Sequence, residues 1–374
     1  MGKKLLILGG GHAHMVTLAN LERFIEKGHE VTVVGPSKYH YYSGMGPGML
    51  GTTYTASEIR FDTQKVVEQK GGKFLLDAVE KVEPINRAAH LRSGAILNYD
   101  VLSFNVGSYV PKDGVMVGDI NENDIFTVKP IEKLQVARDR ILAQCSSKEA
   151  IIAVVGGGPS AAEIAGNILQ LTNMRVCAKP RIIIFSNRKF MARFPKRVRT
   201  LVMDSLVHRG IEIREGCGVS EVEPGLVRLE DKREIACSMI FLALGVKPSS
   251  VFVNSGIPTG PDGGMLVNEY LQSVAHSELF GGGDCISFQS HPLDKVGVYA
   301  VRQNPILFHN LLASLEGEPL LPFEPGGDYL LIFNLGEGFG VLRKSWLTFG
   351  GKPAFLIKDL IDRRFMKKFQ ELEK

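Results

Sequence analysis

Two stretches of the chain share one pattern: a short, continuous apolar run ends in a row of glycines, and apolar residues then recur at helical spacing. The first stretch passes through residues 5–8 (LLIL) into glycines 9–11, and the second through residues 150–155 (AIIAVV) into glycines 156–158. A continuous apolar run of this length is typical of a strand buried on both faces of a parallel sheet. Each stretch therefore predicts a strand, a tight glycine turn and a helix.

A second apolar strand follows each predicted helix, at residues 31–34 and 181–185. A β-turn-α-β unit with a glycine-rich first turn binds dinucleotides, because backbone N–H groups and a helix N-terminus face the pyrophosphate. Gly9 is expected to make the tight turn and Gly11 to let the pyrophosphate approach, while His14 stands where the third glycine would be. The second turn has the complete G-x-G-x-x-A pattern in Gly156, Gly158 and Ala161, so the sequence predicts two dinucleotides in two similar domains.

Composition narrows the class of protein only a little. The chain has 374 residues, enough for two or more domains, and its net charge of +4 is too mild to indicate nucleic acid as a partner. The five cysteines form no C-x-x-C pair and no metal-type cluster, which favours buried thiols in a reducing compartment. A strand pattern at the start argues against a signal peptide, and no apolar run approaches the ~18 residues of a membrane span, so a cytoplasmic protein is expected.

A third glycine-rich segment indicates the architecture. Residues 278–285 (ELFGGGDC) resemble the segment by which two-dinucleotide-domain flavoproteins, the pyridine nucleotide-disulfide oxidoreductase superfamily, return to their FAD domain. Residues 99–108 and 240–248 resemble that family's strand-then-glycine crossovers, and the four motifs follow the family's order. The resemblance implies an α/β fold of two Rossmann-like domains: a discontinuous FAD domain at 1–115 and 265–322, an inserted NAD(P)H domain at 116–264, and a small C-terminal α/β region at 323–374.

The same resemblance implies FAD and NAD(P)H as cofactors. In the family, the acid that matches Asp284 contacts the ribityl–phosphate region of FAD. The acid usually found after the second strand is missing, because the chain reads Gly35-Pro36-Ser37 there. The residues expected to bind the cofactors are Gly9, Gly11, His12, Ala13, Ser43, Gly44, Pro47, Gly107, Gly283, Asp284, Arg302, Gly156, Gly158, Pro159, Ser160, Asn187, Arg188 and Gly245.

Many members of the family relay electrons through a redox-active disulfide, for which this chain has no C-x-x-C pair. Direct hydride exchange between nicotinamide and flavin is expected instead, with a structural role for Cys285. Glu163 is expected on the first turn of the second helix. In the type II NADH dehydrogenase-like branch, which the chain resembles, the matching glutamate faces the contact between flavin and nicotinamide. The alternative is that Glu163 only compensates the positive end of its helix.

Residues 300–305 (AVRQNP) lie where the dehydrogenase branch carries a quinone motif, with Arg302 in the place of its glutamine and Asn304 in the place of its glycine. Glu163 and Gln303 are the candidate catalytic residues, and a quinone or another small molecule is the expected electron acceptor.

Residues 42–48 (YSGMGPG) resemble a loop of the flavoprotein module associated with selenide, water dikinase. A loop rich in glycine and proline can lie flat over a flavin ring, where bulkier side chains would clash. Two alternatives to a quinone reductase stay open: a soluble redox partner, for example in selenium metabolism, and a flavin-holding scaffold without nicotinamide turnover.

After the strand at 181–185 the chain reads Ser186-Asn187-Arg188-Lys189, without the acid that binds an NAD ribose. Six basic residues and no acidic one lie between 186 and 199, and an arginine at this place suits the 2′-phosphate of NADPH. NADPH is therefore favoured over NADH, with a solvated basic loop as the alternative.

Residues 355–369 are expected to form an amphipathic helix, whose apolar side carries Leu356, Ile357, Leu360, Ile361, Met366 and Phe369. Basic residues lie opposite or flank this side, so the helix can lie in the headgroup region of an anionic membrane and make the protein peripheral on the cytoplasmic face. The alternative is that the apolar side packs on the FAD domain or across a homodimer interface.

Overall fold

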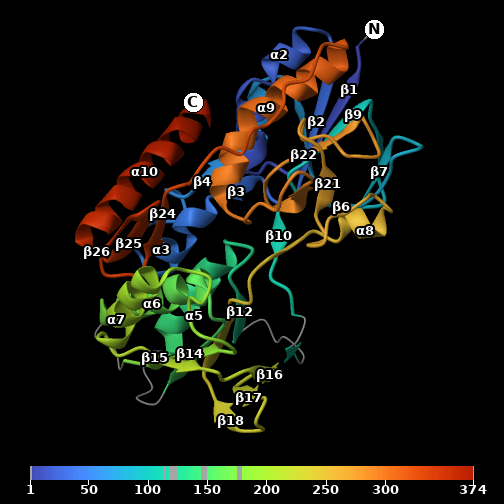
Figure 1. Cartoon of the computed structure of the whole chain (residues 1–374). Helices are drawn as coiled ribbons and strands as arrows, with labels where there is room; N and C mark the ends of the chain where they lie inside the picture. The colour runs from blue at the N-terminus through green and yellow to red at the C-terminus, as the bar shows by residue number, and fades with distance from the viewer. Residues whose placement is uncertain (1, 113–114, 118–123, 145–149, 175–178, 374) are drawn as a thin grey trace.

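The computed structural model describes residues 2–112, 115–117, 124–144, 150–174 and 179–373. Figure 1 shows two lobes, each built around a sheet, with the C-terminal helix α10 (Lys352–Gln370) along one side. The first lobe holds the N-terminal strands together with α9 (Gly297–Glu316), and the second lobe holds the middle of the chain. The predicted α/β class with parallel sheets is confirmed.

A five-stranded parallel sheet forms the core of the first lobe. Its order is β22-β9-β1-β2-β5, with β1 at Lys4–Leu8, β2 at Glu30–Gly35, β5 at Lys73–Leu76, β9 at Val101–Phe104 and β22 at Leu279–Gly281. All four residues of β9 are buried, as are the last four of β1, which fits strands covered on both faces. Because β22 pairs with β9, the chain returns to this sheet after building the second lobe.

The helix predicted after the first glycines is broken into η1 (His12–His14), α1 (Met15–Ala19) and α2 (Glu22–Ile25). Asn304 of α9 explains the first break. Its amide oxygen accepts the N–H of Val16 at 2.7 Å, and its amide nitrogen donates to the carbonyl of His12 at 2.5 Å. These are the two backbone groups that a regular helix would join to each other, so the side chain of Asn304 takes the place of that helical hydrogen bond.

The second lobe repeats the strand order of the first. Its parallel sheet runs β12-β19-β13-β14-β15, with β12 at Ile125–Thr127, β13 at Ile151–Val155, β14 at Arg181–Ser186, β15 at Glu212–Glu215 and β19 at Met239–Leu242. The helices of this lobe are α5 (Lys133–Gln144), α6 (Pro159–Asn173) and α7 (Lys196–Val207). In each sheet the strand that ends in the glycine turn is the third of five.

The two crossover segments pair with each other where the lobes join. Ser108–Tyr109 (β10) and Lys247–Pro248 (β20) form a short antiparallel ribbon. The smaller elements of the two lobes are β3 (Tyr39–Tyr41), β4 (Arg60–Asp62), α4 (Thr63–Gln69), β6 (Val79–Glu83), β7 (Ala88–Leu91), β8 (Ile96–Asn98), β11 (Met116–Val117), β16 (Val219–Glu223), β17 (Leu226–Leu229), β18 (Glu234–Ala236), α8 (Val251–Asn254), β21 (Met265–Val267), η3 (Gly283–Cys285) and β23 (Ile286–Phe288).

The segment predicted to lie as a loop over the flavin ring is helical instead. Ser43–Met45 forms η2, and Gly46–Leu50 forms α3, whose five residues are all buried. A Cβ on Gly46 would meet Ile131 at 3.0 Å, and one on Gly48 would meet Tyr54 at 2.5 Å. The small residues of this segment therefore serve close packing within the protein.

The C-terminal region adds a small sheet and a long helix. The strands β24 (Leu331–Asn334), β25 (Gly340–Lys344) and β26 (Leu347–Gly351) are antiparallel, α10 packs on them, and η4 (Glu371–Glu373) ends the described part. The buried side of α10 carries Ala354, Lys358, Asp362, Met366 and Phe369.

The single apolar face predicted for this helix is therefore wrong. Met366 and Phe369 face the protein, whereas Leu356 and Leu360 are 63% and 70% exposed. The reason is that the buried side includes the charged pair Lys358 and Asp362, which places the apolar side chains of the first turns outward.

Candidate functional site

The first glycine turn is shaped by Asn105, which follows β9. Gly9 has a φ of +90°, and a Cβ at Gly11 would lie 2.0 Å from Oδ1 of Asn105. That amide oxygen accepts the N–H of Ala13 at 3.3 Å, and the amide nitrogen donates to the carbonyl of Gly282 at 2.6 Å. Asn105 thus joins the loops that follow β1, β9 and β22. Sequence reasoning missed its role, although it lies in the first crossover motif.

His14, in the place of the third glycine, has a structural role. Its Nδ1 lies 2.6 Å from the carbonyl oxygen of Gly9, and its Nε2 lies 2.7 Å from Oγ of Ser103. Burial lowers the pKa of His14 to about 4, so the imidazole is neutral, with Nδ1 donating to the carbonyl. The side chain joins the turn at Gly9 to Ser103 of β9, which explains why a glycine is not required there.

The predicted flavin acid is held in place by neighbours on three segments. Asp284 lies in η3, where Gly283 has a φ of +76°, and the N–H of Gly283 donates to Oε1 of Gln303 at 2.7 Å. The carboxylate of Asp284 accepts hydrogen bonds from Ser108 and Lys129 at 2.9 and 2.8 Å. Gln303 is 1% exposed and its amide oxygen is occupied by this backbone contact, so Gln303 positions the loop that carries Asp284.

The first lobe fits a bound dinucleotide. His12 follows the glycine turn, and its Nε2 is buried without a hydrogen-bond partner among the described residues. Buried polar atoms in native proteins nearly always have a partner, so a ligand group is the natural one here. Gly107 has a φ of +71°, and a Cβ at this position would meet no described heavy atom within 4 Å, which leaves backbone open beside this loop.

The second turn leaves an open helix N-terminus. A Cβ at Gly156 would lie 2.2 Å from the carbonyl oxygen of Ala243, so this glycine serves close packing of two strands. A Cβ at Gly158, the N-cap of α6, would meet no described atom within 4 Å, and no side chain caps the helix. Pro159 and Ser160 form its first turn. Unoccupied N–H groups at a helix N-terminus suit a pyrophosphate.

The residues that follow β14 and β19 in the second lobe are open to solvent. The side chains of Asn187 and Arg188 are exposed, and Oγ of Ser186 donates to the backbone carbonyl of Arg188 at 2.7 Å. Gly245 has a φ of +85° with no described atom near its Cβ position. These positions follow the two strands that flank β13, at the same edge of the sheet as the N-terminus of α6, where the pattern predicts the nucleotide.

Glu163 does not lie in the first turn of α6, as expected, but in the second. Its Oε1 accepts the backbone N–H of Asn334 in β24 at 2.8 Å. The carboxylate thus bonds to the C-terminal sheet and does not cap its own helix. Burial raises the pKa of Glu163 to about 7 and Asp362 adds to the rise, while Lys358 and the N–H of Asn334 oppose it.

A buried ion pair lies beside Glu163. Nζ of Lys358 donates to Oδ2 of Asp362 at 2.7 Å and to the carbonyl of Gly44 at 2.9 Å, and the hydroxyl of Tyr42 donates to Oδ1 of Asp362 at 3.1 Å. Lys358 and Asp362 are 7% and 3% exposed. Burial raises the pKa of Asp362 despite its bond to Lys358, and it raises the pKa of Tyr42 well above its usual value. Sequence reasoning missed this pair, because it treated the helix only as an amphipathic surface.

Three further predicted residues take no side-chain part in these contacts. Arg302 donates to the carbonyls of Pro325 and Gly327 at 2.5 and 3.0 Å, so its guanidinium holds the chain that follows α9. Ser43 begins η2, and Pro47 is buried in α3.

Cys285 is fully buried, and burial raises the pKa of its thiol to about 12. Its Sγ donates to the carbonyl of Gly282. The cysteines Cys217, Cys237 and Cys285 are free thiols, and the remaining two, Cys145 and Cys177, lie outside the described residues. The structure thus places Cys285 in a packing role next to the flavin acid.

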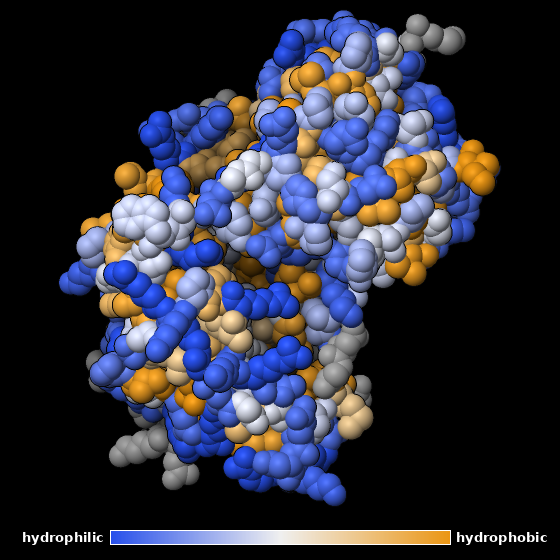
Figure 2. Space-filling model, viewed as in Figure 1, coloured by the Kyte–Doolittle hydropathy of each residue, from blue (hydrophilic) through white to orange (hydrophobic). Residues whose placement is uncertain are grey.

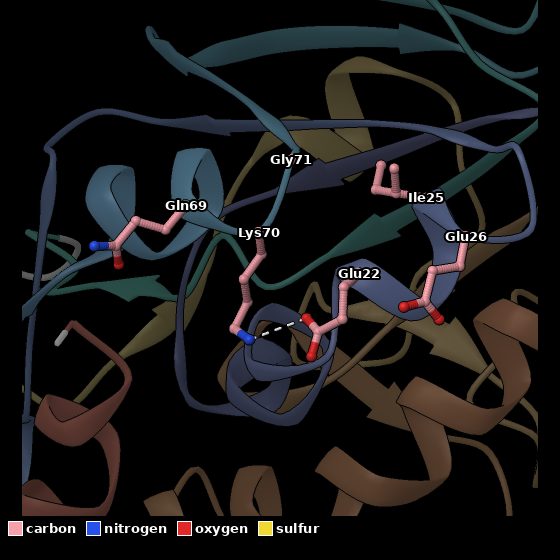
Figure 3. Close-up of a pocket in the computed structure, with 6 residues that line it drawn as sticks. All are labelled: Glu22, Ile25, Glu26, Gln69, Lys70 and Gly71. Atoms are coloured by element: carbon pink, nitrogen blue, oxygen red, sulfur yellow. Dashed lines mark hydrogen bonds and ion pairs between the residues drawn. The ribbon is translucent and has the colours of Figure 1, made fainter.

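A surface pocket of about 350 Å³ lies away from both glycine turns. It is lined by α2 and the end of α4, and its lining includes the ion pair of Lys70 with Glu22 at 3.0 Å. Figure 3 shows Lys70 and Glu22 pointing toward each other, with Ile25 and Glu26 further along from Glu22. None of the predicted site residues lines this pocket, so it is separate from the candidate site.

The fold and the two glycine turns define a class of protein with two Rossmann-like lobes of the kind that bind dinucleotides. The chain belongs to the pyridine nucleotide-disulphide oxidoreductase family, whose sequence profile matches residues 3–305. It is an FAD-dependent NAD(P)H oxidoreductase.

Several known proteins resemble this chain over most of its length. The type II NADH:quinone oxidoreductase of Staphylococcus saprophyticus is 24% identical, over 97% of this chain and 94% of the relative. Ferroptosis suppressor protein 1 of Taeniopygia guttata is 28% identical, over 72% of this chain and 71% of the relative. The solved structure of NDH2 from Plasmodium falciparum in complex with NADH has a TM-score of 0.81 at 14% identity and covers 100% of this chain and 97% of that one.

Proposed function

We propose that this protein takes hydride from NAD(P)H onto FAD and passes the electrons to a quinone, without a relay disulfide. The observation that carries the proposal is the cluster of Glu163 with the buried ion pair of Lys358 and Asp362. It lies where α6 of the second lobe, the 42–48 segment of the first lobe and α10 meet. Bound FAD supplies the hydride acceptor and the electron donor, and the likeness to a type II NADH:quinone oxidoreductase over 97% of the chain supports a quinone as acceptor.

The cluster can supply protons to such an acceptor. Reduction of a quinone to a quinol consumes two protons, and a general acid works best when its pKa lies near the working pH. Glu163, with a pKa of about 7, holds a proton in a large fraction of molecules at neutral pH. Its Oε1 is tied to the N–H of Asn334, so Oε2 is the atom we assign to hold and release the proton. The ion pair of Lys358 and Asp362 lies beside this carboxyl group.

We extend the proposal to NADPH as the preferred donor. Arg188 and Lys189 are exposed after β14 and form no ion pair with a described residue. The carboxylate nearest in register, Glu215 opposite Ser186, is occupied: it accepts the N–H of Phe190 and the guanidinium of Arg199, both at 2.6 Å. Free cations beside an occupied carboxylate favour a nucleotide with a 2′-phosphate.

We also propose that α10 contacts an anionic membrane. The first half of its outer side exposes Leu356, Ile357, Leu360 and Ile361, and the second half exposes Arg363, Arg364, Lys367 and Lys368. In Figure 2 hydrophobic surface lies along the left edge, over the first half of α10, and hydrophilic surface lies over the second half. Among the described residues, no helix is long and apolar enough to cross a bilayer. Partial burial of the apolar half with basic residues at the headgroups fits this arrangement.

The test is anaerobic mixing of the FAD-loaded protein with NADH or NADPH, followed by a water-soluble quinone. The proposal expects the flavin absorbance to bleach with a reduced nicotinamide and to recover on addition of the quinone. A flavin that neither nucleotide bleaches would leave the protein as a flavin-holding scaffold. Bleaching without recovery would exclude the quinone and favour a soluble redox partner. The relation to the module associated with selenide, water dikinase stays a prediction that belongs to this alternative.

A further inference from the structure

Lys129 of the second lobe contacts Asp284 of the first lobe. Lys129 follows β12, the edge strand of the second sheet, and its Nζ lies 2.8 Å from Oδ2 of Asp284 and 2.7 Å from Oγ of Ser108. Ser108 donates to the same carboxylate oxygen at 2.9 Å. The side chains of Lys129 and Asp284 are 23% and 17% exposed, so the pair is largely shielded from water. The three groups form one hydrogen-bonded unit across the junction of the lobes.

This unit lies where both sheets present their carboxyl ends. Ligands of open α/β sheets bind outside the carboxyl ends of the strands, at the point where the strand order reverses. In the first sheet that point lies between β1 and β9, and His12 and Ser108 follow these two strands. Asp284 follows β22 at the same edge, and Lys129 follows a parallel strand of the second sheet. Lys129 therefore lies at the carboxyl end of a strand of the second sheet and contacts the acid at the carboxyl end of the first.

The histidines beside this unit carry no charge at neutral pH. Burial lowers the pKa of His12 to about 4, with Asp284 opposing and Lys129 assisting the shift. Burial lowers the pKa of His40 well below its usual value, and His12 and Lys129 add to this shift. Nδ1 of His12 lies 3.1 Å from Nε2 of His40, a contact that needs one donor and one acceptor and so suits two neutral rings. The fixed charges here are those of Lys129 and Asp284.

Asp284 stays ionised because of its partners. Burial alone would raise its pKa, but the charge of Lys129, with the hydrogen bonds from Lys129 and Ser108, outweighs burial and lowers it. Lys295 adds to the effect, although its ammonium is paired with Asp262 at 2.7 Å. Without Lys129 this edge of the flavin site would carry a net negative charge.

We propose that Lys129 is a flavin-site residue supplied by the second lobe, whose ammonium stabilises the negative charge that FAD gains on reduction. The inference rests on the flavin- and NAD(P)H-dependent function proposed above. Hydride transfer leaves NAD(P)⁺ and brings two electrons and one proton to FAD, which becomes more negative by one charge. The carboxylate of Asp284 opposes that added charge, and the ammonium of Lys129 cancels the carboxylate. Electron uptake by the flavin is thereby made more favourable.

The measurement is the two-electron midpoint potential of the bound FAD in the purified, full-length protein. Lys129→Gln can still donate to Asp284 and Ser108 but removes the charge, and Lys129→Arg is the matched control that keeps it. Lys129→Gln should bind FAD with a potential at least about 30 mV more negative, which corresponds to a tenfold loss in the equilibrium constant for reduction. Lys129→Arg should stay close to the wild type.

A structural role for the ion pair predicts another result. If Lys129 only holds the lobes together, Lys129→Gln lowers thermal stability and leaves the potential unchanged, and that outcome overturns the inference. Lys129→Met, which lacks any donor, serves as a second neutral variant and should show the same negative shift. Should one variant lose FAD, the other gives the potential; should both lose FAD while Lys129→Arg keeps it, the ion pair serves to hold the FAD site together and the inference is overturned. A wild-type protein without FAD would instead defeat the proposed function.

Discussion

Oε1 of Glu163, in the second turn of the nucleotide-binding helix α6, lies 2.8 Å from the backbone nitrogen of Asn334, the last residue of β24. This hydrogen bond fixes the carboxylate between the second lobe and the C-terminal region. The carboxylate therefore does not cap its own helix, and the role of Glu163 at the contact between flavin and nicotinamide stays a prediction.

The raised pKa of Glu163 predicts a pH-dependent stability. Between the ordinary value of 4.5 and about 7, the folded protein holds a proton that the unfolded chain has lost. The free energy of unfolding must therefore fall as the pH rises through this window, by up to about 3 kcal/mol. Glu163→Gln can still accept the N–H of Asn334 but does not titrate. Urea unfolding between about pH 5 and pH 8 should show that the free energy of unfolding of the variant rises relative to that of the wild type as the pH rises. A difference between the two that does not change with pH would contradict the raised pKa.

Loss of Lys358 should leave the carboxylate of Asp362 buried, with the hydroxyl of Tyr42 as its one remaining hydrogen-bond partner among the described residues. Breaking a buried pair in this way typically costs about 3–5 kcal/mol, and we expect a loss of that size in Lys358→Met, measured by urea unfolding. The double variant Lys358→Met/Asp362→Asn removes both charges and should recover much of the loss. Equal losses in the single and double variants would show that the charge of Asp362 is not the cause.

The two glycine turns should respond differently to valine. In Gly11→Val the new side chain collides with Asn105, which holds the loops after β1 and β22, so FAD should be lost. Gly158 has open space at its Cβ position, so Gly158→Val should fold and keep FAD but block the nucleotide. Flavin absorbance and the rate of anaerobic reduction by NAD(P)H check both. Full FAD occupancy in Gly11→Val would contradict the assignment of the first turn as the FAD-binding turn.

Nucleotide preference is tested at Arg188. We expect Arg188→Ala to weaken binding of adenosine 2′,5′-bisphosphate about tenfold, which is about 1.4 kcal/mol, and to leave binding of 5′-AMP unchanged, by calorimetry. Arg197→Ala, an exposed arginine in the first turn of α7, is the control. If the wild type binds both compounds equally, NADPH is not the preferred donor.

Membrane contact is tested on the outer side of α10. Leu356→Ser/Leu360→Ser should abolish sedimentation with anionic vesicles while leaving FAD content unchanged, because both side chains are exposed in the structure. Ile85→Ser is a matched control, since Ile85 is 95% exposed on the first lobe. Binding of the wild type should weaken with added salt, as each basic residue contributes only about 1 kcal/mol near an anionic surface. No sedimentation of the wild type at low salt would remove the membrane from the proposal.

The sequence predicted the parts of the fold that depend on short-range pattern. The apolar runs and glycines at 5–11 and 150–158 place both parallel sheets and both turns, because buried strands and left-handed glycines have local signatures. The parts it missed depend on contacts between distant residues. Asn304 breaks a helix by bonding to backbone groups of residues 12 and 16, and no local pattern reports such a contact.

The candidate site divides in the same way. Asp284 and Glu163 were found through motifs, but their partners Lys129 and Lys358 were not, because each partner comes from a different part of the chain. For α10 the pattern of apolar residues gave the helix but the wrong buried side. A lysine and an aspartate four residues apart are typical of a solvent-exposed ion pair on a helix, and only the fold shows that this pair is covered.

The boundary between the two hydrophobic clusters of the interior does not coincide with the boundary between the two dinucleotide-binding halves. One continuous hydrophobic cluster contains the second sheet, Met366 and Phe369 of α10, and also Met49 and Phe61, which precede that sheet by many residues. The other cluster contains the first sheet and α9. Since cooperative unfolding units follow shared interior contacts, the 45–61 segment should melt with the nucleotide-binding half and α10. A chain cut at the apparent boundary between the halves would therefore separate this segment from the interior that stabilises it.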